Sequence, residues 1–146
     1  MIEIFTMGFT KKSAEEFFTI INKNKIDIVI DVRLNNQSQL AGFTKGKDLA
    51  YFLDKICKCK YSHETMFAPE KTLLDNYKRK SINWFDYEKE YCTLIKKRNV
   101  SEIFKENYSC YNRVLLLCSE PTSDNCHRRL LADHLSAENG YPIKHI

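Results

Sequence analysis

Apolar positions along the chain follow two spacings, one typical of strands and one of helices. Short apolar runs rich in β-branched residues predict strands at 2–6, 26–32 and 114–117, with shorter strands near Tyr61 and at 142–146. Between these runs, apolar residues recur at helical spacing. Strands that alternate with helices form parallel sheets with right-handed crossovers. The pattern therefore predicts a single α/β domain over residues 1–146, with a mostly parallel sheet and helices on both faces.

Helix starts are marked by polar residues. Ser13 and Glu16 form the S-x-x-E pattern of a capping box. Pro69 is suited to the first turn of a helix, since it has no N–H to leave unpaired, and Asn83 is a plausible N-cap for the next helix. We expect a helical flank at about 69–107, which includes a short helix at 101–107.

An aromatic stripe lies in this flank. Trp84, Tyr87, Tyr91 and Leu94 recur at helical spacing. Such a stripe could form a stacking platform for bases, but aromatic burial is a main source of core stability. We therefore expect the stripe to be core.

Composition narrows the class of protein. Hydrophobic residues make up 43% and charged residues 29% of the chain, as in ordinary globular domains, and no apolar run approaches the ~20 residues of a membrane span. The segment MIEIFTMGF lacks the features of a signal peptide, so we expect a cytoplasmic protein with no membrane partner. Its six cysteines should then be reduced.

The net charge gives little evidence for a nucleic-acid partner. The formal charge is +4, with lysine clusters at Lys78–Lys80 and Lys96–Arg98. Cations are favoured at helix C-termini, and this interpretation is preferred to a nucleic-acid patch, which usually shows stronger clustering.

The segment Arg113–Leu135 carries most of the candidate chemistry. It predicts a buried strand, a polar loop and then a helix, and it places Cys118, Cys126, His127, Arg128 and Arg129 at one junction. Ligands of α/β sheets bind where strands end, and helix N-termini favour anions. The junction is therefore a candidate anion-binding site.

Cys118 follows the strand directly. Helix N–H groups and Arg128 would activate its thiolate by lowering the pKa. The alternative is a small apolar residue that seals the strand end, since free cysteines are often buried.

Metal binding is a second interpretation of the junction. Cys118, Cys126 and His127 suit zinc, with His63 or His134 as a fourth ligand. Adjacent ligands at 126 and 127 converge poorly, however, and the chain has no C-x-x-C pair. We therefore predict no metal site and no cofactor.

Arg128 and Arg129 diverge by about 100° on a helix, so only one should face the ligand. The other is expected to pair with a carboxylate such as Asp31 or Glu120.

Asp31 and Arg33 end the strand at 26–32 and point to the same face. Two arrangements stay open. Arg33 and Arg128 could face one another across the sheet edge and form a positive pocket for phosphate or carboxylate. Alternatively, Asp31 could pair with Arg128 and hold the fold together.

Other polar residues are weaker candidates. Thr6 and Gly8 end the first strand and could border the same crevice. The loop at 35–43, with Ser38 and Gly42, could close over a ligand or simply be solvated. His63 and Glu64 could form an acid/base pair, although such a pair in a loop is more often structural.

The motifs IDVRLNNQSQLAGF, FAPEKTLLDNYK and LLLCSEPTSDNCHRRLLADHL resemble the domain of unknown function 488 family over nearly the full chain. The resemblance implies a fold and a motif set, so the reaction must be argued from the site. A looser similarity is to rhodanese-type domains, which place a D-x-R and a reactive cysteine as Asp31, Arg33 and Cys118 stand here. The short glycine-containing loop of those domains is replaced by SEPTSDNCHRR.

Together these features favour an enzyme with an anion-binding pocket that acts on a nucleotide or nucleic-acid-related substrate. Arg33 and Arg128 would hold the anion, and Asp31, Glu120 or His127 would manage protons. One alternative is a non-catalytic module that binds nucleic acid or another partner. A second is thiol-dependent sulfur or redox chemistry at Cys118.

Overall fold

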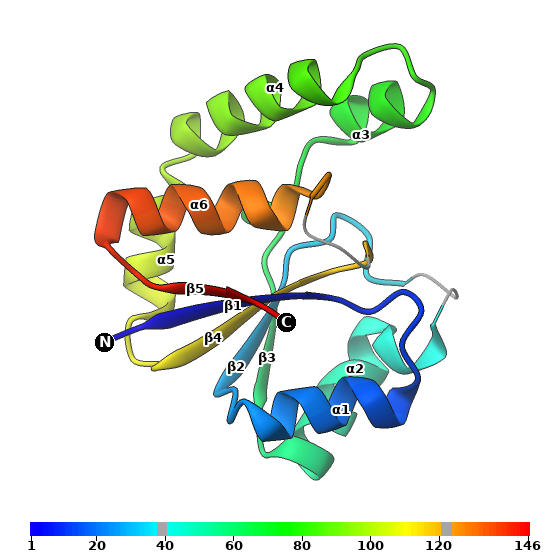
Figure 1. Cartoon of the computed structure of the whole chain (residues 1–146), viewed down its shortest axis with the longest axis vertical. Helices are drawn as coiled ribbons and strands as arrows, with labels where there is room; N and C mark the ends of the chain where they lie inside the picture. The colour runs from blue at the N-terminus through cyan, green and yellow to red at the C-terminus, as the bar shows by residue number, and fades with distance from the viewer. Residues whose placement is uncertain (38–40, 121–123) are drawn as a thin grey trace.

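The computed structural model describes residues 1–37, 41–120 and 124–146 (Figure 1). Its centre is a sheet in which all paired strands are parallel, in the order β3-β2-β4-β1-β5. The strands are β1 (Glu3–Gly8), β2 (Ile28–Asp31), β3 (Lys60–His63), β4 (Arg113–Cys118) and β5 (Ile143–His145). The predicted α/β class is therefore confirmed.

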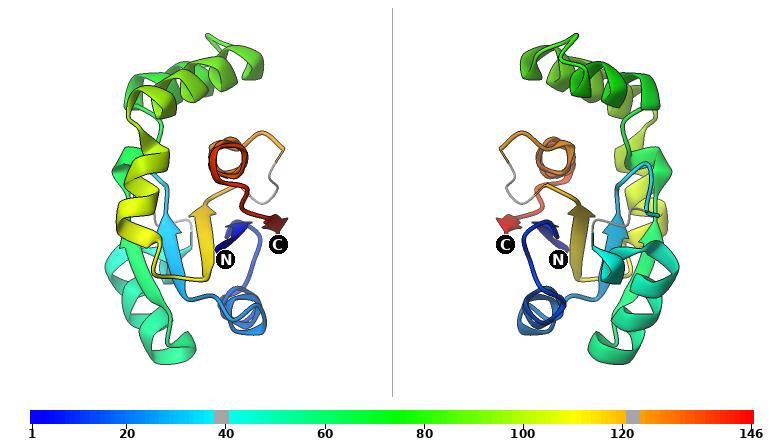
Figure 2. Two further views of the ribbon diagram at one scale, coloured as in Figure 1. Left: turned by 90° about the vertical axis from the view of Figure 1, so that its left-hand side faces the viewer. Right: turned by 90° about the vertical axis from the view of Figure 1, so that its right-hand side faces the viewer.

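Helices cover both faces of the sheet, as Figures 1 and 2 show. Two of them, α1 (Ala14–Lys23) and α2 (Gly46–Phe52), pack on one face, and a π-helical turn at Leu53–Cys57 extends α2. The opposite face carries α4 (Trp84–Lys97), α5 (Val100–Tyr108) and α6 (His127–Asn139). The short helix α3 (Lys71–Lys78) lies beside α4, and 3₁₀ turns stand at Gly42–Thr44 and Thr65–Phe67. The helical flank is thus confirmed.

Local sequence signals account for the helix starts. Ser13 accepts from the Glu16 backbone N–H in a complete capping box, and Asn83 Oδ1 accepts from the Asp86 N–H at 2.8 Å. Helix α3 begins two residues after Pro69, because Glu70 keeps an extended backbone and takes the N-cap position. No described helix has both the length and the apolar character that a membrane crossing requires.

Side chains of each strand divide between two cores. Along β4, Leu115 and Leu117 face α1 and α2, whereas Val114, Leu116 and Cys118 face α6. All five are buried, as expected where helices cover both faces of a parallel sheet. Strand alternation therefore delivers the Cys118 side chain to the α6 face at the carboxyl edge.

The aromatic stripe is core over most of its length. Tyr87 and Tyr91 are buried, while Trp84 is half-buried and stacks on Tyr87 with ring centroids 5.0 Å apart. Tyr77 of α3 packs against both Trp84 and Tyr87. The outer end of the stripe is thus a partly accessible aromatic surface.

Gly8, at the end of β1, lies very close to the backbone of the loop that follows β4. A Cβ at this position would overlap the main-chain carbonyl of Glu120 and approach Arg128 Nη1. We predict that Gly8→Ala lowers the free energy of unfolding by about 3 kcal/mol, because backbone must shift to make room. Urea denaturation monitored by circular dichroism measures the loss.

Gly42→Ala is the matched control, since a Cβ there meets no atom within 4 Å. Equal midpoints for the two variants would contradict the close approach at Gly8.

Candidate functional site

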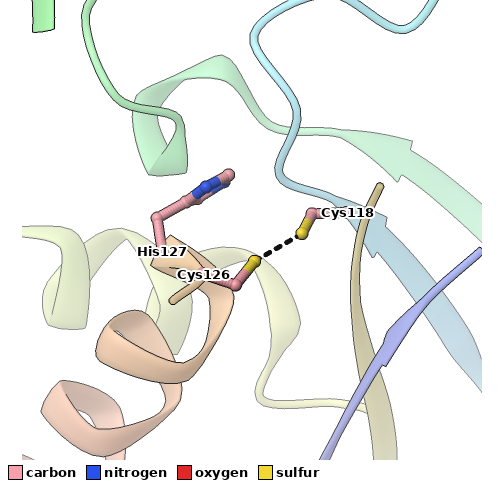
Figure 3. A group of neighbouring side chains, drawn as sticks. All are labelled: Cys118, Cys126 and His127. Atoms are coloured by element: carbon pink, nitrogen blue, oxygen red, sulfur yellow. Dashed lines mark hydrogen bonds between the residues drawn. The ribbon is translucent and has the colours of Figure 1, made fainter. Parts of the chain in front are cut away.

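Two thiols meet where β4 ends and α6 begins. Cys118 is the last residue of β4 and Cys126 is the N-cap residue of α6, and their side chains point toward one another (Figure 3). The two Sγ atoms lie 2.6 Å apart, and each residue is only 2% exposed. The fold thus pairs two sulfur atoms from separate elements in a buried position.

A buried guanidinium lies against this pair. Arg128 is 2% exposed, and its Nη1 lies 3.4 Å from each sulfur and donates to the main-chain oxygen of Glu120 at 2.6 Å. Within the described ranges, no carboxylate lies at ion-pair distance from Arg128. A buried cation without an anion is costly. The sulfur pair is therefore the group placed to balance its charge.

Within the pair, the surroundings favour the negative charge on Cys118. Burial raises the pKa of the Cys118 thiol, but the hydrogen bond with Cys126 and the charges of His127 and Arg128 outweigh it and lower the pKa to about 6. The same contact with Cys118 raises the pKa of Cys126 well above its ordinary value. These shifts favour the thiolate at Cys118 and the protonated thiol at Cys126.

His127 is fixed beside the pair by its ring nitrogen. Nε2 lies 2.9 Å from the carbonyl oxygen of Val32, so Nε2 carries the proton and donates it. The ring packs edge-on against Tyr91. In the neutral ring, Nδ1 is then the atom left to accept a proton.

Cys118, Cys126 and His127 also form the one group, among the residues that the structure describes, with ligand atoms close enough to surround a metal ion. These atoms lie within 4.8 Å of one another. Two thiolates on one tetrahedral zinc stand roughly 3.8 Å apart, given Zn–S bonds of about 2.3 Å. The sulfur atoms, which lie 2.6 Å apart, would have to separate to hold zinc.

Asp31 and Arg33 form a buried ion pair with each other. Arg33 Nε donates to Asp31 Oδ1 at 2.8 Å and Nη2 to Oδ2 at 2.6 Å, while the Tyr61 hydroxyl donates to Oδ2 at 2.7 Å. Arg33 also donates to the Thr44 carbonyl and stacks over Phe9. The common face of Asp31 and Arg33 is confirmed.

The expected ion pair between Asp31 and Arg128 is wrong in this structure, and the expected positive pocket of Arg33 and Arg128 loses the net charge of Arg33. The carboxylate of Asp31 is taken by Arg33, since two residues of spacing on one strand bring the side chains together. Arg33 therefore brings a neutral pair to the sheet edge, and Asp31 makes no bridge to Arg128.

The two adjacent arginines diverge as predicted. Arg128 turns into the core, whereas Arg129 is only half-buried and pairs with Asp133 at 3.2 Å and with the Asp124 carbonyl. The prediction that this arginine pairs with Asp31 or Glu120 is wrong. Arg129 pairs with Asp133 instead, because Asp133 lies one turn further along the same helix face.

A cavity of about 700 Å³ opens beside the thiol pair. Its inner wall includes Cys118, Cys126, His127, Glu120, Arg33 and Phe9, and its outer wall includes Tyr77, Trp84, Tyr87, Lys71 and Lys78. Arg33 Nη1 is buried and has no hydrogen-bond partner within the described residues. Arg33, a residue of the inner wall, thus keeps one buried donor that has no hydrogen bond among the described residues.

The sequence marked Trp84 and Tyr87 as a possible stacking platform, but it did not place the residues of α3 at the site. Lys71, Tyr77 and Lys78 stand on α3, which no chemical motif marks, and only the packing of α3 beside α4 brings them to the site. The FAPEKTLLDNYK stretch was the available signal, since it contains Lys71 and Tyr77.

Four of the remaining candidates, Thr6, Gly42, His63 and Glu64, do not line the cavity. Thr6 is fully buried and its Oγ1 bonds with His145 Nδ1 at 2.5 Å. Gly42 begins a 3₁₀ turn, and Ser38 lies outside the described residues. His63 and Glu64 form no pair with each other: His63 Nε2 bonds with the Arg33 carbonyl, and Glu64 accepts from Tyr108.

Comparison with known proteins identifies the family of this chain. A family model described as "Domain of unknown function DUF488" matches residues 13–135, which include Asp31, Arg33, the thiol pair and Arg128. No curated protein and no solved structure shows significant similarity to the chain.

The Asp31–Arg33 pair predicts a large stability effect. Asp31→Asn would leave the Arg33 guanidinium, 6% exposed, without its counter-charge. Breaking such a buried pair costs about 3–5 kcal/mol. The measurement is the free energy of unfolding in urea.

Asp133→Asn serves as the control, because it removes a half-exposed carboxylate from a surface pair with Arg129. We expect a change below about 1 kcal/mol there. A small effect at Asp31 as well would show that the buried pair does not stabilise the fold.

Proposed function

Since the chain belongs to the domain of unknown function 488 family, whose name assigns no reaction, we propose its function from the site: an enzyme in which the Cys118 thiolate attacks a nucleotide-like substrate. The observation that carries this proposal is the position of Cys118. Its sulfur lies on a cavity wall and is the counter-charge of a buried cation, Arg128.

The nucleophile is activated by its surroundings. A thiolate, and not a thiol, attacks electrophiles, and cationic neighbours favour it. Arg128 holds the Cys118 sulfur in the charged form, and Cys126 supplies a second donor. His127, fixed through Val32, is the nearby group that exchanges a proton with the substrate through Nδ1.

The outer wall supports the substrate class. Tyr77 and Trp84, which are half-buried and pack on buried Tyr87, offer aromatic surface suited to a planar base. Exposed Lys71 and Lys78 stand on the same wall, and the inner wall includes Arg33, whose buried Nη1 has no partner among the described residues. Aromatic faces next to cationic donors match a nucleobase that bears phosphate or another anion.

In this proposal Arg33 keeps a binding role, although its charge is already balanced by Asp31. A neutral pair with one free donor binds a substrate oxygen through a hydrogen bond, without adding net charge. Arg128 serves the thiolate, so the lysines provide the positive charge that holds the anion.

The first test is the pH dependence of alkylation. Because the pKa of Cys118 is lowered to about 6, its thiolate should persist at neutral pH and disappear below that value. Peptide mapping after brief iodoacetamide treatment should show Cys118 modified at pH 7, with a rate that falls to half near pH 6. Arg128→Lys should move the midpoint to higher pH, since it removes the Nη1 donor.

Circular dichroism shows whether each variant is folded, and exposed Cys110 is an internal control for reagent activity. An ordinary thiol titration at Cys118 would remove the nucleophile from the proposal.

The second test concerns the substrate. Nucleoside mono- and diphosphates should bind with micromolar to millimolar affinity, measured by calorimetry. Replacing both Lys71 and Lys78 with Gln should weaken binding roughly tenfold, about 1.4 kcal/mol, the scale of two exposed ion contacts. Lys47→Gln on α2, across the sheet, is the matched control.

Two outcomes of this test favour the other functions. Steeply salt-dependent binding of DNA or RNA that Cys118→Ser leaves unchanged supports a non-catalytic nucleic-acid-binding module. Transfer of sulfur from thiosulfate to Cys118, without nucleotide binding, supports rhodanese-like chemistry.

A further inference from the structure

Cys126 has no part in the proposed catalysis beyond its hydrogen bond, yet its thiol is in contact with the nucleophile. The two Sγ atoms lie 2.6 Å apart, and both residues line the cavity through which small molecules would enter. Among the described residues, no hydrogen bond joins any of the other four cysteines to a second thiol: Cys57 and Cys59 donate to main-chain carbonyls, and Cys92 and Cys110 are free cysteines.

We propose that Cys118 and Cys126 are a modification site, at which a hydroperoxide that enters the cavity produces a reversible disulfide. The inference rests on the proposed function, because the thiolate that attacks the substrate also attacks the peroxide. The disulfide removes that nucleophile and switches the enzyme off.

The first step oxidises Cys118. Its thiolate attacks one oxygen of the hydroperoxide, a sulfur–oxygen bond forms and the oxygen–oxygen bond breaks. The leaving alkoxide takes a proton from solvent and departs as an alcohol, or as water when the oxidant is hydrogen peroxide. Cys118 is left as a sulfenic acid.

The second step uses Cys126. Its sulfur attacks the Cys118 sulfur, its thiol proton goes to the departing hydroxyl group, and water leaves as the sulfur–sulfur bond forms. In total, two thiols lose two electrons and two protons, and one hydroperoxide becomes an alcohol and water. A dithiol reductant reverses the change and restores both thiols.

The surroundings favour this pair over any other. Arg128 Nη1 lies 3.4 Å from both sulfur atoms, so it stabilises the Cys118 thiolate that attacks and the thiolate that is released on reduction. Cys126 stands outside the regular turns of α6 with an extended backbone, φ −138° and ψ 137°. Its side chain is therefore directed by the loop and is held against Cys118.

The experiment treats the reduced full-length protein with one equivalent of hydrogen peroxide, then blocks free thiols with N-ethylmaleimide. Intact-mass analysis should show the loss of two hydrogen atoms and protection of two thiols. Peptide mapping without reduction should join Cys118 to Cys126, and dithiothreitol should release both. Cys110→Ser, at an exposed cysteine, should leave the disulfide unchanged.

Cys126→Ser is the decisive variant. It should form no disulfide and should instead accumulate a Cys118 sulfenic acid that dimedone traps. Circular dichroism verifies folding, and Cys126→Ala provides a second variant without a hydroxyl group.

The outcomes separate this inference from the proposed function. If Cys118 is alkylated rapidly at pH 7 but peroxide forms no Cys118–Cys126 bond, the inference is wrong and the nucleophile stands. If Cys118 reacts with neither reagent, both are wrong. Protein that contains one equivalent of zinc, with both thiols protected from peroxide, also overturns the inference.

Discussion

The arrangement of the site depends on one buried cation, the guanidinium of Arg128. It is almost fully enclosed, and in the described parts of the chain no carboxylate approaches it to ion-pair distance. A charge in this position needs a counter-charge, and the nearest candidates are the sulfur atoms of Cys118 and Cys126. The chemistry of the pair is therefore a consequence of how the fold neutralises an arginine.

The second buried arginine shows what the usual solution looks like. Arg33 is satisfied by Asp31 through two hydrogen bonds, and Tyr61 completes the coordination of the carboxylate. One buried arginine thus pairs with a carboxylate at the sheet edge, and the other lies against two sulfur atoms.

Much of the fold was predictable from local signals, because strand preference and helix capping depend on residues that are close in the sequence. The β-branched run near Val29 produced a central strand, and Ser13 and Asn83 cap helices as their side-chain oxygens require. The strand–loop–helix junction was found for the same reason. Ion-pair partners were not, since Asp31 had two arginines within plausible reach and only tertiary packing selects one. The outer wall of the cavity depends on how α3 packs on α4, which no local pattern encodes.

Strand order has a consequence for how the site comes into being. In β4 the register places Cys118 beside Gly8 of β1, and Leu117 beside Asp31 of β2, so the neighbours of the thiol come from distant parts of the chain. Contacts between remote segments form late and slowly, because long loops must close before any pairing rewards them. During synthesis β4, which carries Cys118, emerges long after its partners β1 and β2. The nascent polypeptide therefore holds an incomplete sheet, with open edges on β1 and β2, until β4 inserts between them, and this insertion is the step at which misassembly competes with folding.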